Sequence, residues 1–173
     1  MTTTHAEDEG DVRVRQAVQA DLLAVLRIER ASFDQPWPFS AFERYLGEPG
    51  FLVAVTGGGP SPADEQGEPR ADENVVGYVV ANLVPNHGRS FGHVKDIAVH
   101  PDHRGEGVGA DLLEHSLRVL EVQGAQSVKL EVRASNETAL SLYRGFGFQY
   151  LRTIPRYYDD GEDALILVVD LDA

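Results

Sequence analysis

Apolar and polar residues follow two different periods along this chain, and the two periods predict its strands and helices. Apolar residues alternate with polar ones, or form short apolar runs, over several stretches typical of β-strands. These stretches cover residues 12–14, 51–55, 75–84, 91–99, 128–132, 148–154 and 164–171. Elsewhere apolar residues recur every three or four positions, which is typical of amphipathic helices. The predicted helices cover residues 21–31, a short stretch that begins near Ser40, 108–124 and 137–144.

The order of these elements predicts an α/β fold of the α+β kind with a mixed sheet. Two helices follow the first strand, three strands come next, and a helix then joins two strands that must run parallel. We therefore expect a mainly antiparallel sheet of about seven strands, flanked by about four helices. In the first helix, Leu22 and Leu26 mark the expected apolar face, and Glu29 and Arg30 the expected polar face.

Length and local composition divide the chain into one folded domain and two polar segments. A chain of 173 residues is expected to form a single domain, here over residues 11–173. Residues 1–10 are polar and are expected to form a disordered tail. Residues 56–74 are rich in glycine, proline and acidic residues, and are expected to form a flexible acidic hairpin insertion.

An aromatic segment, FDQPWPFSAFERYLG at residues 33–47, follows the first helix. Pro36 and Pro38 forbid one continuous helix through it. Its tryptophan and phenylalanines predict either a plug of the hydrophobic core or one wall of a binding groove. The residues alone leave both interpretations open.

The chain is strongly acidic, with a net charge of −13 from 28 acidic and 15 basic residues. A surface that binds nucleic acid would be basic, so the charge argues against direct nucleic-acid binding. Lys95 and Lys129 are the only lysines among the bases. This balance fits adaptation to high salt, where ions screen the repulsion between carboxylates, or a coding bias that favours arginine.

Several other classes of chemistry and location are excluded by composition. The chain has no cysteine, which rules out disulfides, thiol nucleophiles and cysteine-ligated metals. Its six histidines show no recognised metal-binding spacing, so we expect no metal. No apolar run approaches a membrane span, and the acidic N-terminus lacks the features of a signal peptide. We therefore expect a cytoplasmic protein without membrane contact.

The segment HPDHRGEGVGADLL, residues 100–113, places glycines between a predicted strand and a predicted helix. Gly105, Gly107 and Gly109 then lie at a helix N-terminus, where free backbone N–H groups and the helix dipole favour an anion. Arg104 adds a planar guanidinium that suits phosphate oxygens. The segment therefore predicts a phosphate-binding loop.

Three interpretations of this loop compete. Arg104-x-x-Gly107-x-Gly109 resembles the pyrophosphate loop of the Gcn5-related N-acetyltransferases (GNATs). Gly105-x-Gly107-x-x-Ala110 fits the dinucleotide fingerprint, with Glu131 near the spacing of a ribose-binding acid. The third interpretation is a tight turn that binds no ligand. A dinucleotide fold needs a second half, for which too few residues follow Glu131. It also needs a glycine-rich turn after a strand near the start of the chain, which this sequence lacks.

A second motif favours the acetyltransferase interpretation. The segment KLEVRASNETALSLYRGFGF, residues 129–148, closely resembles the RimI-type GNATs, which are ribosomal-protein alanine N-acetyltransferases, and their archaeal protein N-terminal relatives. The resemblance extends from Val12 to Leu171 and includes the element order. It implies a GNAT fold, acetyl-CoA as cosubstrate, a protein or peptide N-terminus as acceptor, and a monomer or weak dimer.

The resemblance also implies two catalytic roles. Acetyl transfer needs a base to remove a proton from the amine and an acid to protonate the departing thiolate. By resemblance Glu131 is the general base, acting through an ordered water, and Tyr143 is the acid. Without the resemblance, Glu131 is a solvent-facing carboxylate balanced by Lys129 or Arg133, and Tyr143 is a packed aromatic side chain.

The predicted cosubstrate site spans three parts of the chain. Asn136 is suited to cap the helix that follows it, and by resemblance it also binds the coenzyme arm. The backbone of 97–99 is implied to line the pantetheine. The full set comprises Ile97, Ala98, Val99, Arg104, Gly105, Glu106, Gly107, Val108, Gly109, Ala110, Asn136 and Tyr143.

The acceptor is predicted from weaker signals. An α-amino group is roughly 14% neutral at pH 7, against roughly 0.04% for a lysine, so a modest base suffices for protein N-termini. Tyr157 and Tyr158 resemble the paired tyrosines with which N-terminal acetyltransferases contact a peptide, and Phe33 and Trp37 would form the opposite wall. Cross-strand packing is the alternative role for the tyrosines. An enzyme for small amines or lysine, and a non-catalytic acyl-CoA-binding module, remain the alternative functions.

Overall fold

A seven-stranded sheet forms the centre of the protein, with the strand order β1-β2-β3-β4-β5-β7-β6. The computed structural model describes residues 12–57 and 73–171. The predicted tail and residues 58–72 of the predicted insertion lie outside the described residues. The elements are β1 (Arg13–Gln16), α1 (Leu22–Ser32), α2 (Phe39–Glu43), β2 (Phe51–Thr56), β3 (Asn74–Val84), β4 (Phe91–Val99), α3 (Val108–Val122), β5 (Ser127–Arg133), α4 (Glu137–Gly145), β6 (Gln149–Ile154) and β7 (Ala164–Asp170). Two short 3-10 turns, Gln19–Asp21 and Pro101–His103, precede α1 and α3.

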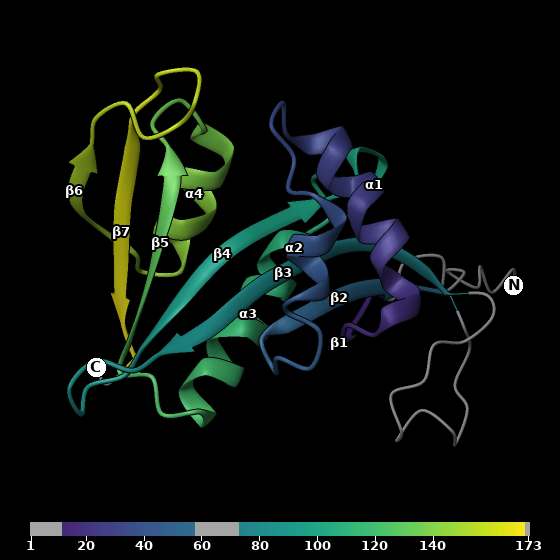
Figure 1. Cartoon of the computed structure of the whole chain (residues 1–173), viewed down its shortest axis with the longest axis horizontal. Coiled ribbons are helices and arrows are strands. Elements are labelled where there is room, and N and C mark those ends of the chain that lie inside the picture. Colours follow the sequence, from purple (N-terminus) through teal and green to yellow (C-terminus); the bar gives the residue numbers. More distant parts are fainter. Residues whose placement is uncertain (1–11, 58–72, 172–173) are drawn as a thin grey trace, which may run out of the picture.

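Helices cover both faces of the sheet, as the element order predicts (Figure 1). Residues of α3 and α4 share one hydrophobic core with the sheet, and residues of α1 and α2 share a second core with β2 and β3 on the other face. In β5, Val128, Leu130 and Val132 belong to the first core. Because side chains alternate along a strand, Lys129 and Glu131 face the side that carries α1 and α2.

The neighbours β4 and β5 run parallel, but they pair over only part of their length. The register joins Phe91 to Ser127 at one end and Val94 to Leu130 at the other. Beyond Val94 the two strands diverge and leave a V-shaped opening in the middle of the sheet (Figure 1). One edge of β4 therefore presents backbone groups without a neighbouring strand from Lys95 to Val99.

A bulge in β4 changes which side chains enter this opening. Against β3, Val94 pairs with Ala81 and Asp96 pairs with Val80, so Lys95 is an extra residue. An extra residue shifts the alternation of side chains by one position. As a result, His93 and Asp96 both reach groups on the side of the sheet that carries α1, although an odd number of positions separates them.

The prediction of a polar face at Glu29 was wrong. Glu29 is 1% exposed and lies in the buried stripe of α1 with Leu22, Val25 and Leu26. A period of 3.6 residues places positions 22, 25 or 26, and 29 on one face, so the carboxylate extends this stripe rather than the opposite face. A buried carboxylate requires partners, and Glu29 accepts the Trp37 N–H at 3.0 Å and the Tyr78 hydroxyl.

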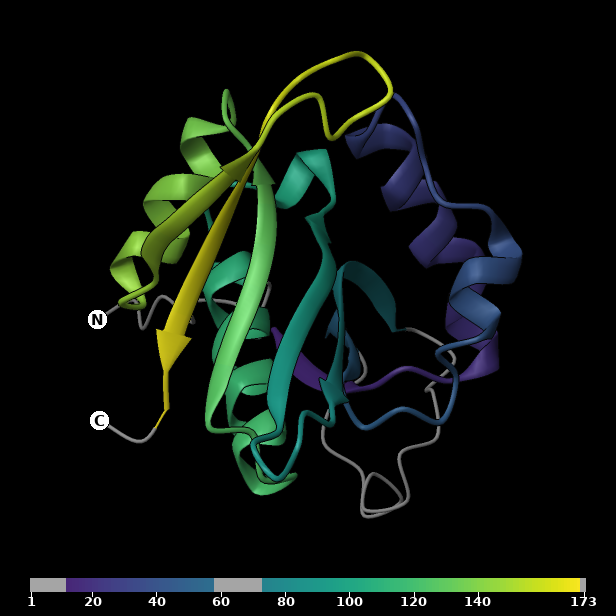
Figure 2. The same ribbon diagram turned by 60° about the vertical axis from the view of Figure 1, so that its left-hand side comes forward.

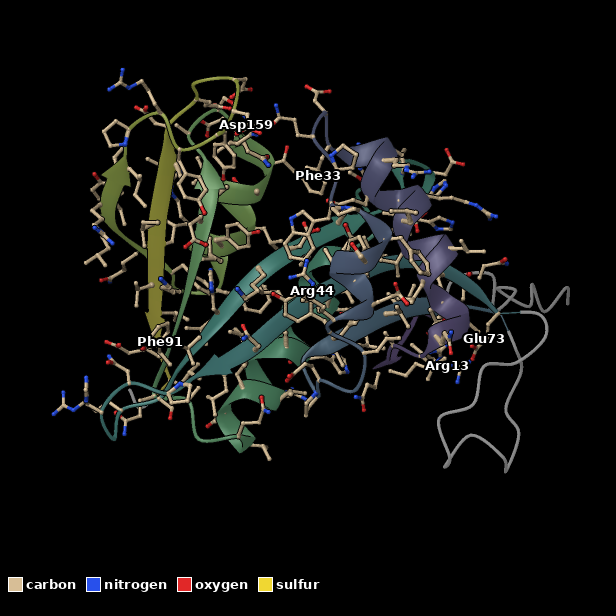
Figure 3. All side chains as sticks on the ribbon, in the orientation of Figure 1. Arg13, Phe33, Arg44, Glu73, Phe91 and Asp159 are labelled. Atoms are coloured by element: carbon tan, nitrogen blue, oxygen red, sulfur yellow. The ribbon has the colours of Figure 1, made fainter. Side chains whose placement is uncertain are left out.

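A network of ion pairs holds the edge of the sheet formed by β1. Arg15 donates to both oxygens of Asp21 at 2.8 and 3.0 Å and to Glu73 at 2.9 Å, and Arg13 reaches the other oxygen of Glu73 at 2.5 Å. Arg13 and Glu73 are labelled in Figure 3. The network ties β1 and the turn before α1 to the residue that leads into β3.

None of the helices in the described part of the chain is long and apolar enough to cross a membrane.

Replacing Gly50 with alanine tests the close packing of β2 on β3. A Cβ at Gly50 would lie 2.1 Å from the carbonyl oxygen of Ala81. The backbone would have to move to relieve this clash. We expect Gly50→Ala to lower the free energy of unfolding by about 1–3 kcal/mol. Gly145→Ala is the control, because nothing lies within 4 Å of its added Cβ. Urea unfolding measures both, and equal stabilities would contradict the close approach.

Candidate active site

The glycine loop connects the open end of β4 to α3, as predicted. Gly105 and Gly107 have φ angles of +79° and +86°, in the left-handed region that favours glycine. Arg104 lies on the surface beside them, and its guanidinium donates to the carbonyl of Val99 and to Oγ of Ser32, both at 3.2 Å. The loop is thus held by the end of β4 and by the end of α1.

This arrangement fits a diphosphate. Residues 104–107 are exposed, and the first N–H groups of α3 have no partner within the helix. Val108 is buried in the core and anchors the start of α3, whereas Gly109 and Ala110 are partly buried. Of the predicted pantetheine-lining residues, Ala98 turns its side chain into the second core. The side chains of Ile97 and Val99 pack against the first core, so a ligand at this edge of β4 would meet backbone groups, of which the Val99 carbonyl already accepts from Arg104.

Glu131 lies at the point where β4 and β5 separate. Its Oε2 is 2.5 Å from Nε2 of His93, and its Oε1 is 3.9 Å from Nζ of Lys129. Because an ionised carboxylate only accepts hydrogen bonds, His93 is the donor. Burial raises the pKa of Glu131, but the hydrogen bond from His93 and the charges of His93 and Lys129 outweigh burial and lower this pKa below its ordinary value. Glu131 is therefore ionised at neutral pH.

Tyr143 extends from α4 and is 5% exposed. Its ring packs 5.8 Å from Phe148, which is the packing role that the sequence left open. Burial raises the pKa of the Tyr143 phenol, and the charges of Asp96 and Tyr158 raise this pKa further. Packing and proximity to the opening therefore coexist in this residue.

The connection between β6 and β7 places Tyr157 and Tyr158 beside Glu131. The two rings meet edge to face with their centroids 5.0 Å apart. The Arg133 guanidinium lies 4.0 Å from the Tyr158 ring and pairs with Asp160 at 2.8 Å. Burial, opposed by Arg133 and reinforced by Tyr157 and Glu131, raises the pKa of Tyr158 to about 12. Arg133 on β5 thus holds the Tyr158 ring, and Tyr157 packs against that ring.

The aromatic segment after α1 lies at the same end of the molecule as this connection (Figure 2). Phe33 and, from the β6–β7 connection, Asp159 are labelled at this end in Figure 3. Trp37 stacks on Tyr45 at 5.9 Å and packs on Phe42 at 5.4 Å, and Phe33 packs against the same core. Both Phe33 and Trp37 remain partly exposed. The segment therefore plugs the core while its outer surface stays accessible.

Asn136 caps α4, as predicted, because its Oδ1 accepts from the Ala139 N–H at 3.1 Å. The side chain is exposed at the start of the helix. This bond fixes Asn136 at the end of β5, beyond Glu131.

The contact of His93 with Glu131 was not predicted from the sequence. The residue lies within a predicted strand, but its partner Glu131 is 38 positions away on a strand that pairs only briefly with β4. The motif that identifies Glu131 does not contain His93. The signal that was available is a histidine on β4 near the last paired position.

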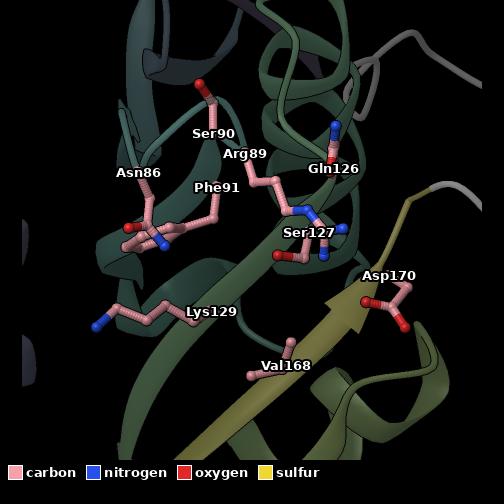
Figure 4. Close-up of a pocket in the computed structure, with 9 residues that line it drawn as sticks. All are labelled: Asn86, Arg89, Ser90, Phe91, Gln126, Ser127, Lys129, Val168 and Asp170. Carbon is pink, nitrogen blue, oxygen red and sulfur yellow. The ribbon is translucent and has the colours of Figure 1, made fainter.

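A separate hollow of about 500 Å³ lies at the closed end of the sheet rather than beside Glu131 and Tyr143 (Figure 4). It opens near the starts of β4 and β5 and the end of β7. Lys129 borders it, with Nζ 5.4 Å from the centroid of the Phe91 ring. Its lining comprises Asn86, Arg89, Ser90, Phe91, Gln126, Ser127, Lys129, Val168 and Asp170.

Known proteins share this architecture. An N-alpha-acetyltransferase of Sulfolobus acidocaldarius is 34% identical over 98% of both chains. The ribosomal protein bS18-alanine N-acetyltransferase of Escherichia coli is 31% identical over 87% of this chain and 92% of its own. The crystal structure of Ard1 from Thermoplasma volcanium superposes with a TM-score of 0.77 at 25% identity, over 92% of this chain and 97% of its own.

The sequence model of the Acetyltransferase (GNAT) family matches residues 22–148, which include the glycine loop, Glu131 and Tyr143. The matched segment extends from α1 to the end of α4 and holds both walls of the opening between β4 and β5. With the family match and these relatives together, the chain belongs to the GNAT family of acetyltransferases.

Proposed function

We propose that this chain transfers the acetyl group of acetyl-CoA to the N-terminal α-amino group of proteins by direct attack of the amine in a ternary complex. The observation that carries the proposal is the opening between β4 and β5. The glycine loop follows the open end of β4, an ionised carboxylate lies where β4 and β5 separate, and the helix after β5 carries the buried phenol of Tyr143. Relatives named as N-alpha-acetyltransferases over nearly the whole chain support the choice of acceptor.

The cosubstrate would bind along the open edge of β4. Arg104 and the amides around Gly105 to Gly109 would hold the diphosphate. Backbone groups at the open edge of 97–99, other than the Val99 carbonyl that accepts from Arg104, would pair with the amides of the pantetheine arm, and Asn136 would contact the same arm from the other wall. Acetyl-CoA supplies the thioester carbonyl that the amine attacks. These contacts would place that carbonyl near Glu131 and Tyr143.

Glu131 would attract the acceptor and remove its proton. An α-amino group is largely an ammonium at neutral pH, which the Glu131 carboxylate attracts, and the ammonium releases one proton to water before its nitrogen can attack the thioester carbonyl. A low pKa makes Glu131 a weak base, but the nitrogen becomes strongly acidic once it attacks a carbonyl. A weak base that is already ionised and oriented is therefore sufficient, and His93 provides the orientation through its hydrogen bond.

Tyr143 would deliver a proton to the departing thiolate. It is buried and neutral at physiological pH, because burial raises the pKa of its phenol. A neutral phenol keeps its proton until a stronger base forms beside it. The thiolate that leaves the thioester is the group that would draw this proton.

The walls of the opening would select an extended N-terminus. Tyr157 and Tyr158 would form one wall near Glu131, whose charge adds to burial in raising the pKa of both phenols, and Phe33 lies at the same end of the molecule after α1. A chain end fits between such walls, whereas a lysine in the middle of a chain brings two flanking chain segments with it. The exposed outer surface of Trp37 would belong to the same wall.

A peptide panel tests the acceptor. Peptides with free N-terminal Ala, Ser or Met are offered with acetyl-CoA and thiol release is followed, beside polyamines and lysine peptides whose N-termini are blocked. We expect release only with free N-termini. Release only with polyamines or blocked lysine peptides would overturn the proposed acceptor.

Glu131→Gln tests the base. The amide keeps the shape of the side chain but cannot take a proton, so we expect kcat to fall by about 10²–10⁴-fold. Binding of acetyl-CoA, measured by calorimetry, should remain within about twofold of the wild type because the coenzyme contacts lie elsewhere. An unchanged kcat would remove Glu131 from the mechanism.

Gly107→Ala tests the loop. A Cβ at this left-handed position strains the backbone by about 1 kcal/mol, and the loop relieves the strain by changing its conformation. We expect the KM for acetyl-CoA to rise by about tenfold with little change in kcat. Gly88→Ala is the control: its φ is +82° and nothing lies within 4 Å of its added Cβ, but it lies in the turn before β4. An equal effect of both variants on KM would show that the loop does not bind the cosubstrate.

A further inference from the structure

Glu29 is bonded to both residues that the proposed function places in the aromatic wall facing the acceptor, Phe33 and Trp37. Its backbone carbonyl accepts the Phe33 N–H at 3.0 Å in the last turn of α1. Its carboxylate accepts the Trp37 N–H at 3.0 Å through Oε1. Glu29 is 1% exposed, and the proposed chemistry does not use it. One buried residue therefore holds both ends of this wall.

The connection between α1 and α2 has few other contacts that fix its backbone. Pro36 and Pro38 have no N–H to donate, and Trp37 lies between them. Among the described residues, the bond to Glu29 is the one hydrogen bond that residues 34–37 make. Without this bond, only the packing of the Trp37 ring would hold this part of the connection.

A second hydrogen bond fixes the direction in which the Glu29 carboxylate points. The Tyr78 hydroxyl donates to Oε2, and Tyr78 is 0% exposed on β3. The Tyr78 ring meets Phe42 edge to face at 5.5 Å, and Phe42 packs on Trp37 at 5.4 Å. Because both carboxylate oxygens have a partner, Glu29 links the Trp37 backbone to the central sheet.

We propose that Glu29 is a positioning residue for acceptor recognition: it fixes the aromatic wall relative to the tyrosine pair and thereby restricts the first side chain of the acceptor. This inference rests on the proposed function, which places an N-terminus between these walls. A wall that is fixed before binding costs the acceptor less ordering than a wall that moves. A loosened wall would bind a well-fitting acceptor more weakly and discriminate less between small and large first residues.

Two substitutions separate the hydrogen bonds of Glu29 from the space that it fills. Glu29→Gln keeps an oxygen that accepts the Trp37 N–H, and the Tyr78 hydroxyl can accept from the new amide. Glu29→Leu fills similar space but its side chain accepts no hydrogen bond. The backbone bond to Phe33 remains in both. Val25→Ala is the control for a weakened α1, because Val25 is 0% exposed in the same core and its side chain forms no hydrogen bond.

Fluorescence reports on this wall directly, because Trp37 is the only tryptophan of the chain. We expect acrylamide to quench Trp37 more steeply in Glu29→Leu than in the wild type, since the freed segment exposes the ring more often. Glu29→Gln and Val25→Ala should be quenched like the wild type. This measurement needs neither cosubstrate nor acceptor.

Kinetics with free-N-terminal peptides test the function of the wall. We expect Glu29→Leu to raise the KM for the best peptide by about fivefold to tenfold, since losing one hydrogen bond weakens binding by that order. The kcat and the KM for acetyl-CoA should stay within about twofold of the wild type. The spread of kcat/KM among peptides that begin with Ala, Ser or Met should narrow. Glu29→Gln and Val25→Ala should keep wild-type values.

A structural role alone gives a different pattern. If Glu29 only stabilised α1, Val25→Ala would raise the peptide KM as Glu29→Leu does, and that result would overturn the inference. Failure of Glu29→Gln to retain the wild-type KM would also overturn it. In a Trp37→Ala background, Glu29→Leu should not raise the peptide KM further, and an undiminished further rise would contradict the proposed route through Trp37.

Tyr78→Phe is the second, milder variant in case Glu29→Leu does not fold, which thermal unfolding shows. It keeps the ring beside Phe42 and removes the hydroxyl that orients Glu29. We expect the quenching of Trp37 and the peptide KM to rise in the same direction but less. Unchanged values in the folded variants would overturn the inference. A wild type that acetylates no free-N-terminal peptide would instead refute the proposed function.

Discussion

The separation of β4 from β5 is the constraint on which the rest of this structure depends. The strands are joined over a few residues and then part, so the sheet is continuous at one end and open at the other. The opening exposes one backbone edge of β4, brings the side chains of both strands to its sides, and leaves the start of α3 at its end. The two cores lie on opposite faces of the sheet.

Charge is distributed around the opening in a way that suits its chemistry. Glu131 is held ionised at the base by His93 and Lys129. The tyrosine pair above it is held in place by Arg133, which is itself balanced by Asp160 and Glu162. Each charge is thus paired with a neighbour that fixes its position. A site built in this way needs little rearrangement when a charged amine enters, which is the condition for electrostatic catalysis.

Periodicity alone predicted most of the fold, because each strand and helix has one face buried in a core. The element order and the single parallel pairing follow from the same pattern and are confirmed. The motif around Glu131, Asn136 and Tyr143 predicted the residues of one wall because they are close in sequence. The structure places them at the end of β5 and along α4.

The other wall was not predictable in the same way. The bulge at Lys95 depends on the pairing of β4 with β3, and a strand pattern does not show where an extra residue falls. Glu29 was assigned to a solvent-facing surface because a carboxylate in a helix is usually exposed. Its burial is explained by the Trp37 N–H and the Tyr78 hydroxyl, which lie outside α1. Contacts across elements therefore determine this wall, and local sequence does not record them.

The exposed edge of β4 has a consequence for solubility. A strand edge with free N–H and C=O groups is a template for pairing with another chain, and proteins usually protect such edges from aggregation. Here the edge lies inside the sheet, with β5 and β7 along one side and the glycine loop at its end. A strand of another protein would have to enter between β4 and β5 to pair with this edge. The fold thus keeps an unpaired strand edge inside the sheet, where it is better shielded than an edge at the border of the sheet would be.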